Sequence, residues 1–291
     1  MLEALQHRYP ALWPWIQLMR LDRPIGTLLL LWPTLWAVWV AGDGSPSVRV
    51  VIVFTLGVIV MRAAGCVIND YADRNFDGEV SRTRNRPLAT GALRGRDALM
   101  LFAGLMAVAL VLVLLLNRFT FYLAFVGAAL AIIYPFMKRF TFLPQLFLGA
   151  AFAWAIPMAF AAETGSLPAA AWLIFVAKLL WTVAYDTQYA MCDREDDLKV
   201  GIKSTAILFG EADRLIIGIL QLLALWPLWL LGQGLGFGWP WYLAMAVAAG
   251  LFIYQQWLIR DREPAACFRA FLNNQWVGAV LFAGIFLQYL L

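Results

Sequence analysis

Half of the 18 acidic residues of this 291-residue chain lie in two short windows, 70–79 and 186–197. The aspartates that matter most are Asp70, Asp73 and Asp77 in the first window and Asp186, Asp193 and Asp197 in the second. Spacings of three and four residues in the first window, and of seven and four in the second, predict that each set lies on one face of a helix. Like charges placed in this way destabilise a helix by roughly 0.2–0.5 kcal/mol per pair. We therefore expect a cation to bind between them.

The residue types around the two windows indicate which cation this is. The only histidine is His7, and the three cysteines are far apart with no CxxC pattern, which argues against a zinc site, a disulfide framework or histidine-based catalysis. Ligands that are all oxygen favour a hard ion, and Mg²⁺ usually binds one or two carboxylates together with substrate phosphates. Two facing clusters thus predict a clamp for an Mg²⁺-bound diphosphate, with all six aspartates as metal ligands and catalytic residues. The alternative is two solvated acidic loops.

Basic and polar residues near the windows are candidates for binding a diphosphate or a second substrate. We select Arg23, Arg62, Asn69, Lys138 and Arg139. Arg62 lies about two turns before Asn69, at a depth where a cation is unfavourable without a partner, so we expect it to point into a cavity. Lys178, two turns before Asp186, invites the same interpretation. Further basic residues follow the windows at Arg82, Arg84, Arg86, Lys199 and Lys203. The alternative for most of them is that they only reflect the usual excess of basic residues on the inner side of a membrane and bind no substrate.

Aromatic residues lie among the acidic ones, and two of them, Tyr185 and Tyr189, are on the acidic helix itself. An aromatic face stabilises a nearby cation by about 0.5–2 kcal/mol. These two tyrosines can therefore face an allylic cation formed when a diphosphate leaves. Anchoring at the membrane interface is the alternative and accounts for most of the 14 tryptophans.

The elements that position these residues are membrane spans. The chain is 63% hydrophobic and 14% charged, with a mean hydropathy of +0.75, whereas soluble proteins have about 25% charged residues. Crossing the hydrocarbon core requires about 20 apolar residues. Nine segments qualify and predict an all-α integral membrane fold, with nine helices bundled around a central cavity: 23–41, 48–69, 98–116, 120–137, 142–162, 169–189, 213–232, 239–259 and 270–290.

Basic residues are distributed unevenly between the connecting segments. With the N-terminus on the cytoplasmic side, the inner segments contain 18 of the 22 lysines and arginines and the outer segments contain two, Arg49 and Arg118. This asymmetry predicts the orientation and places both acidic windows on the cytoplasmic side. It also explains the net charge of +4 without nucleic acid. The first apolar run lacks a cleavage pattern typical of a signal peptide, and a bacterial inner membrane fits best.

Both acidic windows resemble the motifs of the UbiA superfamily of membrane prenyltransferases. NDYADRNFD (69–77) fits its first motif, NDxxDxxxD, and DTQYAMCDREDD (186–197) fits its second, DxxxxxxDxxxD. Longer segments are similar to the bacterial branch that prenylates 4-hydroxybenzoate in ubiquinone biosynthesis. They are RPIGTLLLLWPTLWA (23–37), RAAGCVINDYADRNFD (62–77), NRPLATG (85–91), YPFMKRFTFLPQ (134–145), IPMAFAA (156–162) and WTVAYDTQYAMCDREDDLKVGIKSTAILFG (181–210).

The resemblance implies a single prenyltransferase domain over 1–291, with aspartate-rich cytoplasmic segments at 69–97 and 186–212. It further implies Mg²⁺-dependent transfer of a polyprenyl group from polyprenyl diphosphate to 4-hydroxybenzoate, ortho to the hydroxyl. Arg23, Arg62 and Lys138 are unranked candidates for binding the acceptor carboxylate. Two alternatives remain open: a related prenyltransferase acting on a naphthoate or homogentisate, and a divalent-cation or solute transporter. Transporters usually place ionisable sites near the bilayer midplane, whereas these acids gather at span ends.

Overall fold

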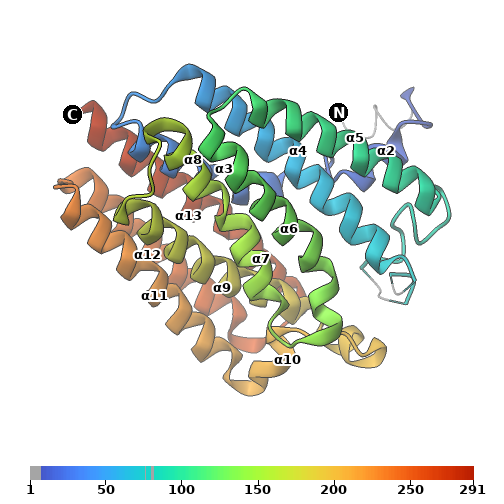
Figure 1. Ribbon diagram of the computed structural model, residues 1–291. Coiled ribbons are helices and arrows are strands. Elements are labelled where there is room, and N and C mark those ends of the chain that lie inside the picture. The colour runs from blue at the N-terminus through green and yellow to red at the C-terminus, as the bar shows by residue number, and fades with distance from the viewer. Residues whose placement is uncertain (1–7, 76, 80–81) are drawn as a thin grey trace.

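The computed structural model describes residues 8–75, 77–79 and 82–291, so His7 lies outside the described residues. Within these ranges every regular element is a helix, and no strand is found (Figure 1). Two single turns of 3-10 helix, Gly210–Ala212 and Ile259–Asp261, supplement the α-helices. The α-helices are α2 (Trp13–Leu18), α3 (Ile25–Ala41), α4 (Val48–Asp73), α5 (Gly95–Leu114), α6 (Arg118–Phe140), α7 (Pro144–Ala153), α8 (Ala155–Thr164), α9 (Ala169–Val200), α10 (Thr205–Phe209), α11 (Asp213–Gly234), α12 (Trp239–Leu258) and α13 (Pro264–Leu290).

The predicted spans correspond to these helices. Among the described residues, eight helical segments are long and apolar enough to cross a membrane, with α7 and α8 counted as one. The remaining predicted span, 23–41, is the 17-residue helix α3. It begins late because Pro24 is its N-cap. The span predicted at 142–162 is divided at Trp154, between α7 and α8. The all-helical, multi-pass membrane fold is thus confirmed, and nine is an approximate count.

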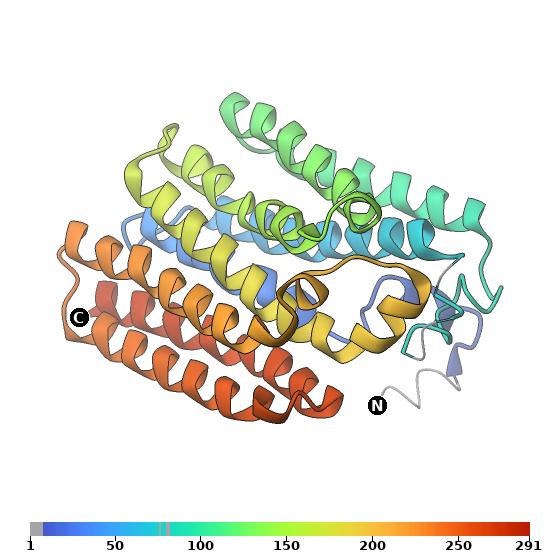
Figure 2. The ribbon, with the colours of Figure 1, turned by 90° about the horizontal axis from the view of Figure 1, so that it is seen from below.

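Helix α9 lies at the centre of the bundle. It packs against α11, α7, α13 and α3, while α4 packs on α3 and α5. Helices α5 and α6 lie along one edge, far from α11, α12 and α13, as Figure 2 shows. Only two residues of each are buried, Ala98 and Val113 in α5 and Thr120 and Pro135 in α6. Most of the surface of α5 and α6 is therefore available to lipid, and their inner sides border the space next to α4.

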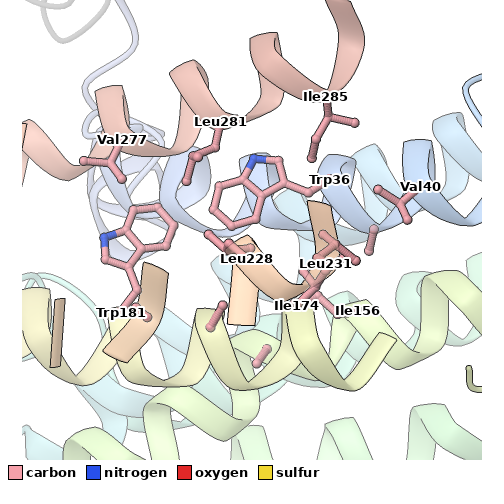
Figure 3. Close-up of a cluster of buried hydrophobic side chains, with 14 of the residues drawn as sticks. Trp36, Val40, Ile156, Ile174, Trp181, Leu228, Leu231, Val277, Leu281 and Ile285 are labelled. Atoms are coloured by element: carbon pink, nitrogen blue, oxygen red, sulfur yellow. The ribbon is translucent and has the colours of Figure 1, made fainter. Parts of the chain in front are cut away.

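A pair of stacked tryptophans connects α9 to α3. The Trp36 and Trp181 rings are 5.5 Å apart and nearly parallel, at 16°, and aliphatic side chains such as Ile174 and Leu281 surround them (Figure 3). Both indole N–H groups donate to α13: Trp36 to the Gly278 carbonyl at 3.0 Å and Trp181 to Asn274 Oδ1 at 2.7 Å. Buried indoles need such acceptors, and these bonds fix how α3, α9 and α13 are placed against one another.

Buried amide side chains connect the face of α9 that points away from the cavity to α11, α12 and α13. Asn274 Nδ2 donates to Gln188 Oε1 at 3.0 Å, and Gln188 Nε2 donates to Gln255 Oε1 at 3.2 Å. Gln221 Nε2 donates to the same Gln255 oxygen at 2.8 Å. All four side chains are buried, so their polar groups depend on one another. The network fixes α9 to α11, α12 and α13, leaving its opposite face to line a cavity.

Candidate active site

Two adjoining cavities lie where α4 and α9 end. The larger, here called the large cavity, has a volume of about 500 Å³. The smaller, here called the polar chamber, has a volume of about 140 Å³ and is lined by Asp73, Asp77, Asp186, Asp193 and Asp197. The sixth predicted aspartate, Asp70, lines the large cavity. Six residues line both: Asn69, Arg82, Arg86, Tyr134, Asp186 and Tyr189. Segments more than 100 residues apart in sequence therefore form one continuous site.

The first acidic cluster, Asp70, Asp73 and Asp77, is buried, with exposed fractions of 1%, 3% and 5%. Asp70 accepts from Arg20 Nη2 at 3.0 and 2.8 Å. Arg86 Nη1 lies 3.0 Å from Asp70 and 3.0 Å from Asp77, so it bridges the two. Buried carboxylates require such partners. The charges of Asp70 and Asp77 are thus matched by arginines of the chain itself.

Asp77 differs from the prediction that all three aspartates share a helix. Helix α4 ends at Asp73, and Asp77 lies beyond it, with its backbone N–H bonded to the Asp73 carbonyl at 2.9 Å. The turn brings its carboxylate back toward Asp70 through Arg86. Burial raises the pKa of the Asp77 carboxyl above its ordinary value, and the Arg86 guanidinium opposes that rise. Segment 69–97 is described except for residues 76, 80 and 81.

Asp73 connects the first cluster to α6. Asn69 Nδ2 donates to Asp73 Oδ2 at 3.2 Å, and Lys138, near the end of α6, forms an ion pair with the same oxygen. The other oxygen, Asp73 Oδ1, is buried without a hydrogen-bond partner in the described structure. A buried oxygen with unused acceptor capacity, in a chamber lined by carboxylates, fits a hard cation such as Mg²⁺.

The second acidic cluster, Asp186, Asp193 and Asp197, lies entirely on α9, which continues past the predicted end at residue 189. All three are partly buried. Arg82, in the loop after the first cluster, donates through Nε to both oxygens of Asp193 at 2.9 and 3.0 Å. It also bonds Tyr189 Oη and lies 4.4 Å from the centre of that ring. Arg82 therefore connects the loop of one cluster to the helix of the other.

All six aspartates line the two adjoining cavities, but their carboxylates do not converge on a common position. Within the described ranges, no three carboxylate, cysteine or histidine side chains converge closely enough to hold a metal ion. The carboxylates of the first cluster are each turned toward an arginine or lysine, as is Asp193. The donor set is nevertheless entirely oxygen, as Mg²⁺ prefers. The arrangement therefore offers both carboxylates for a cation and guanidinium groups for phosphate oxygens.

Arg62 projects from α4 against α3, where it lines the large cavity. Its Nε is buried without a partner, and its guanidinium lies 6.0 Å from the centre of the Phe152 ring. A Cβ at Gly26 would collide with this guanidinium, so the glycine in α3 provides the space that it occupies. No carboxylate pairs with Arg62 in the part of the chain that the structure describes. Among the three acceptor candidates, it is the one with a buried guanidinium nitrogen and no anionic partner in the described residues.

Of the other predicted basic residues, Lys138 lines the polar chamber, whereas Arg23, Arg139 and Lys178 are less well placed. Arg23 borders the large cavity, but 69% of its side chain is exposed and its Nε is 3.5 Å from Asp22. Arg139 lines neither cavity and donates to the Ala72 carbonyl. Lys178 also lines neither cavity, contrary to expectation, because its amine points between α9 and α3. Of these three, only Arg23 borders the site, and it does so at the exposed edge.

The sequence alone does not select three residues of the site. It gives Arg20 only as an inner basic residue, yet Arg20 binds Asp70, with its backbone in the left-handed region at φ 56°. It gives Arg82 and Arg86 only as flanking charges, yet Arg82 binds Asp193 and Arg86 bridges two aspartates. For Arg86 the sequence does contain a signal, because it lies in the NRPLATG segment (85–91) that resembles the family. For Arg20 there was none, because its position depends on an irregular turn between α2 and α3.

The tyrosines form part of the cavity wall. Tyr185 and Tyr189 both line the large cavity, next to Phe271, at ring-centre distances of 6.0 and 4.6 Å. Beyond them the lining is mainly apolar, with Met106 and Val113 of α5 and other side chains of α4, α6 and α8. The site thus has a charged end and an apolar end, with aromatic rings between them.

Comparison with known proteins gives concordant results. Residues 30–286 match the model of the UbiA prenyltransferase family. The 4-hydroxybenzoate octaprenyltransferase of Alcanivorax borkumensis is 66% identical over 99% of this chain and 100% of its own length. The octaprenyltransferase of the same name from Pseudomonas aeruginosa is 58% identical over 100% of this chain and 98% of its own.

Solved structures share the fold. The UbiA homologue of Aeropyrum pernix has a TM-score of 0.79 at 24% identity, covering 89% of this chain and 97% of its own. The UbiA homologue of Archaeoglobus fulgidus, solved with GPP and Mg²⁺ bound, has a TM-score of 0.69 at 20% identity, covering 94% of this chain and 99% of its own. The resemblance inferred from the two aspartate motifs is confirmed. The chain belongs to the UbiA prenyltransferase family.

Proposed function

We propose that this protein transfers a polyprenyl group from polyprenyl diphosphate to 4-hydroxybenzoate, on the ring carbon ortho to the hydroxyl, in an Mg²⁺-dependent reaction. The observation that carries the proposal is the joint lining of the two cavities: aspartates of both clusters surround a polar chamber that shares residues with an apolar cavity. Full-length relatives at 58–66% identity that act as 4-hydroxybenzoate octaprenyltransferases support the choice of acceptor. The membrane is a bacterial inner membrane and the site faces the cytoplasm, in accord with the distribution of basic residues.

The charged end is assigned to the diphosphate. Asp70, Asp73, Asp77, Asp186, Asp193 and Asp197 would hold Mg²⁺. Bound there, the ion would neutralise the diphosphate and make it a better leaving group. Arg20, Arg82, Arg86 and Lys138 already face these carboxylates and can donate to phosphate oxygens. Guanidinium groups suit this task because they bind phosphate in a bidentate manner.

The apolar end is assigned to the reacting carbons. Its side chains exclude water, which would otherwise capture an allylic cation. The faces of Tyr185 and Tyr189 lie at the boundary between the two ends and can stabilise positive charge by about 0.5–2 kcal/mol. Arg62, whose Nε is buried and which lacks an anionic partner among the described residues, is assigned to the carboxylate of 4-hydroxybenzoate. Arg23 and Lys138 are less suited, since one is exposed and the other is paired with Asp73.

Membranes that contain the protein test the reaction directly. Given polyprenyl diphosphate and 4-hydroxybenzoate, they should form 3-polyprenyl-4-hydroxybenzoate, lose this product in EDTA and regain it with added Mg²⁺. A naphthoate and homogentisate, supplied in parallel, test the related acceptors. Efficient prenylation of either, with none of 4-hydroxybenzoate, would overturn the proposed acceptor.

Arg62→Met tests the acceptor assignment, with Arg23→Met as its matched control. Hydrogen bonds to a charged group contribute about 1.5–3 kcal/mol, so the KM for 4-hydroxybenzoate should rise roughly 10- to 150-fold in Arg62→Met. The KM for polyprenyl diphosphate should stay near that of the wild type. Arg23→Met should change neither constant by more than about twofold, as is usual for exposed ion pairs. An unchanged acceptor KM in Arg62→Met would refute this assignment.

A further inference from the structure

Lys178 is a fully buried lysine in the first half of α9 for which the proposed chemistry has no use. Its Nζ donates to the Leu29 carbonyl at 3.1 Å and to Tyr185 Oη at 2.9 Å. Aromatic rings surround the amine, with ring centres at 4.6 Å for Trp181 and 5.6 Å for Phe152. No carboxylate pairs with it in the described part of the chain. An ionisable group at such a depth is unfavourable, so its presence calls for a function.

A proline explains why the Leu29 carbonyl accepts this bond. In a helix the carbonyl of residue 29 would accept from the N–H of residue 33. Residue 33 is Pro33, inside α3, and has no N–H to donate. The Leu29 carbonyl is therefore left without its helical partner in the interior of the protein, and Lys178 supplies the missing donor. The lysine completes the hydrogen bonding of α3 from a different helix.

Both partners of Lys178 belong to the wall of the large cavity. Leu29 and Gly26, one turn apart on α3, line it, and Gly26 is the residue against which the Arg62 guanidinium packs. Tyr185 lines it from α9. In Figure 3 the neighbouring Trp181 and Trp36 project toward each other from these two helices. A single amine therefore connects the surface behind Arg62 with the ring assigned to the allylic group.

We propose that Lys178 is a positioning residue that holds the acceptor in line with the allylic carbon. It does so by fixing Tyr185 and the segment of α3 behind Arg62 to each other. This inference rests on the proposed function, because it presupposes an aromatic acceptor near Arg62. It requires no contact between Lys178 and either substrate. The amine acts through its two hydrogen bonds alone.

The consequence is a partition between two products. When the acceptor is aligned, the diphosphate C–O bond breaks, the allylic carbon bonds to the ring and the ring loses a proton. When it is misaligned, water can attack the same carbon, giving a polyprenyl alcohol, inorganic diphosphate and a proton. The fraction of cleaved donor recovered as alcohol therefore measures alignment. A residue that only supports the fold would change the amount of active protein and leave this fraction unchanged.

Lys178→Met is the principal test, because methionine removes both bonds while retaining an unbranched side chain. Small misplacements of reacting groups reduce rates by up to about 100-fold. We expect the alcohol fraction to rise about tenfold and kcat/KM for the acceptor to fall roughly 10- to 100-fold. The KM for polyprenyl diphosphate should change by less than about twofold, since Lys178 lines neither cavity. A wild-type alcohol fraction in folded Lys178→Met would overturn the inference.

Thr187→Val is the matched control. Thr187 is also fully buried on α9, where its hydroxyl bonds the Val183 carbonyl and Thr205, and it lines neither cavity. Its loss should lower the melting temperature without raising the alcohol fraction. If Thr187→Val raises that fraction as much as Lys178→Met does, the effect reports general loosening of α9, and the inference fails.

Two further variants distinguish the two roles of Lys178, which are to position the acceptor and to supply a donor to the Leu29 carbonyl. Pro33→Ala restores an N–H for the Leu29 carbonyl, so in that background Lys178→Met should destabilise the fold less, while the alcohol fraction stays raised. Tyr185→Phe keeps the bond from Lys178 to Leu29 and should raise the alcohol fraction by a smaller factor. If the Lys178→Met protein does not accumulate, Tyr185→Phe becomes the test of the inference. An alcohol fraction in Tyr185→Phe equal to that of the wild type would then overturn it. A wild-type protein that prenylates no aromatic acceptor would instead refute the proposed function.

Discussion

The first and second acidic clusters differ in what holds their carboxylates in place. The aspartates of the first are at most 5% exposed and are paired with Arg20, Arg86 and Lys138, which come from three separate segments of the chain. Those of the second lie on one continuous helix and are partly exposed. Within the described ranges, one of them, Asp193, has an ion pair, formed with Arg82 from the loop of the first cluster.

The difference separates two roles. The first cluster depends on tertiary contacts, so its carboxylates contribute both to the fold and to the site. The second is positioned by α9, whose far side is fixed by the buried amide network of Gln188, Gln221, Gln255 and Asn274. In the described part of the chain Asp186 and Asp197 form no ion pair, and Asp193 forms the single one with Arg82, so these carboxylates contribute less to the fold. Substitutions in the two clusters should therefore have different effects on stability and similar effects on turnover.

The largest effect is expected for Asp70→Asn. It leaves Arg20 and Arg86, both largely shielded from water, facing a neutral amide, and breaking a buried ion pair lowers the free energy of unfolding by about 3–5 kcal/mol. It also removes a proposed metal ligand, so turnover should fall by about 10³-fold or more. Thermal unfolding in detergent and the prenylation assay measure the two effects. A free energy of unfolding equal to that of the wild type would contradict the contribution of the first cluster to the fold.

Asp193→Asn and Asp197→Asn should lower turnover almost as much, by about 10²- to 10³-fold, but leave folding nearly unchanged. Both side chains lie on the surface of the polar chamber and are partly exposed, so the melting temperature should stay within about 2–4 °C of the wild type. The same unfolding and turnover measurements apply. Wild-type rates in both variants would show that the second cluster has no part in the reaction.

Arg82→Lys tests the contact between the two clusters. Lysine retains the charge but loses the bidentate bond to Asp193 and the stacking on Tyr189. We expect kcat/KM for polyprenyl diphosphate to fall about tenfold. Arg84→Lys is the matched control, because Arg84 is exposed and lines neither cavity. Equal losses in the two variants would indicate a general effect of the loop.

The smallest effect is expected for Glu195→Gln. Glu195 lies two residues after Asp193 on the same helix but is exposed and lines neither cavity. Turnover should stay within about twofold of the wild type, and the free energy of unfolding within about 0.5 kcal/mol. Steady-state kinetics and thermal unfolding measure both. A large loss of activity would mean that charge anywhere in the second window matters, rather than charge at the chamber.

The sequence was sufficient for the helices and for the meeting of the two clusters, because apolar length and the repeat of aspartates are local properties. It predicted the direction of Arg62 correctly, since a cation at that depth needs a cavity or a partner. The same reasoning was wrong for Lys178. Its partner is a carbonyl freed by Pro33 on another helix, and no pattern within α9 contains that information.

The order of the three acceptor candidates also required the structure. Arg23, Arg62 and Lys138 are all basic, and what distinguishes them is the exposure of Arg23, the contacts with Asp22 and Asp73, and the unpaired buried Nε of Arg62. The position of Asp77 beyond the end of α4 depends on a turn. Such turns are set by packing against loops whose conformation a helical repeat does not specify.

Arg20 has a consequence for the start of the chain. Its backbone is held in the left-handed region, a conformation that is unfavourable by about 1–3 kcal/mol for a residue other than glycine, while Leu18 beside it is buried against Val67 and Leu93. The contact with Asp70 retains that strain. We therefore expect a change at this carboxylate to alter the turns around α2. A fluorophore or a protease site introduced just before Trp13 should therefore respond to events in the large cavity, which Arg20 lines.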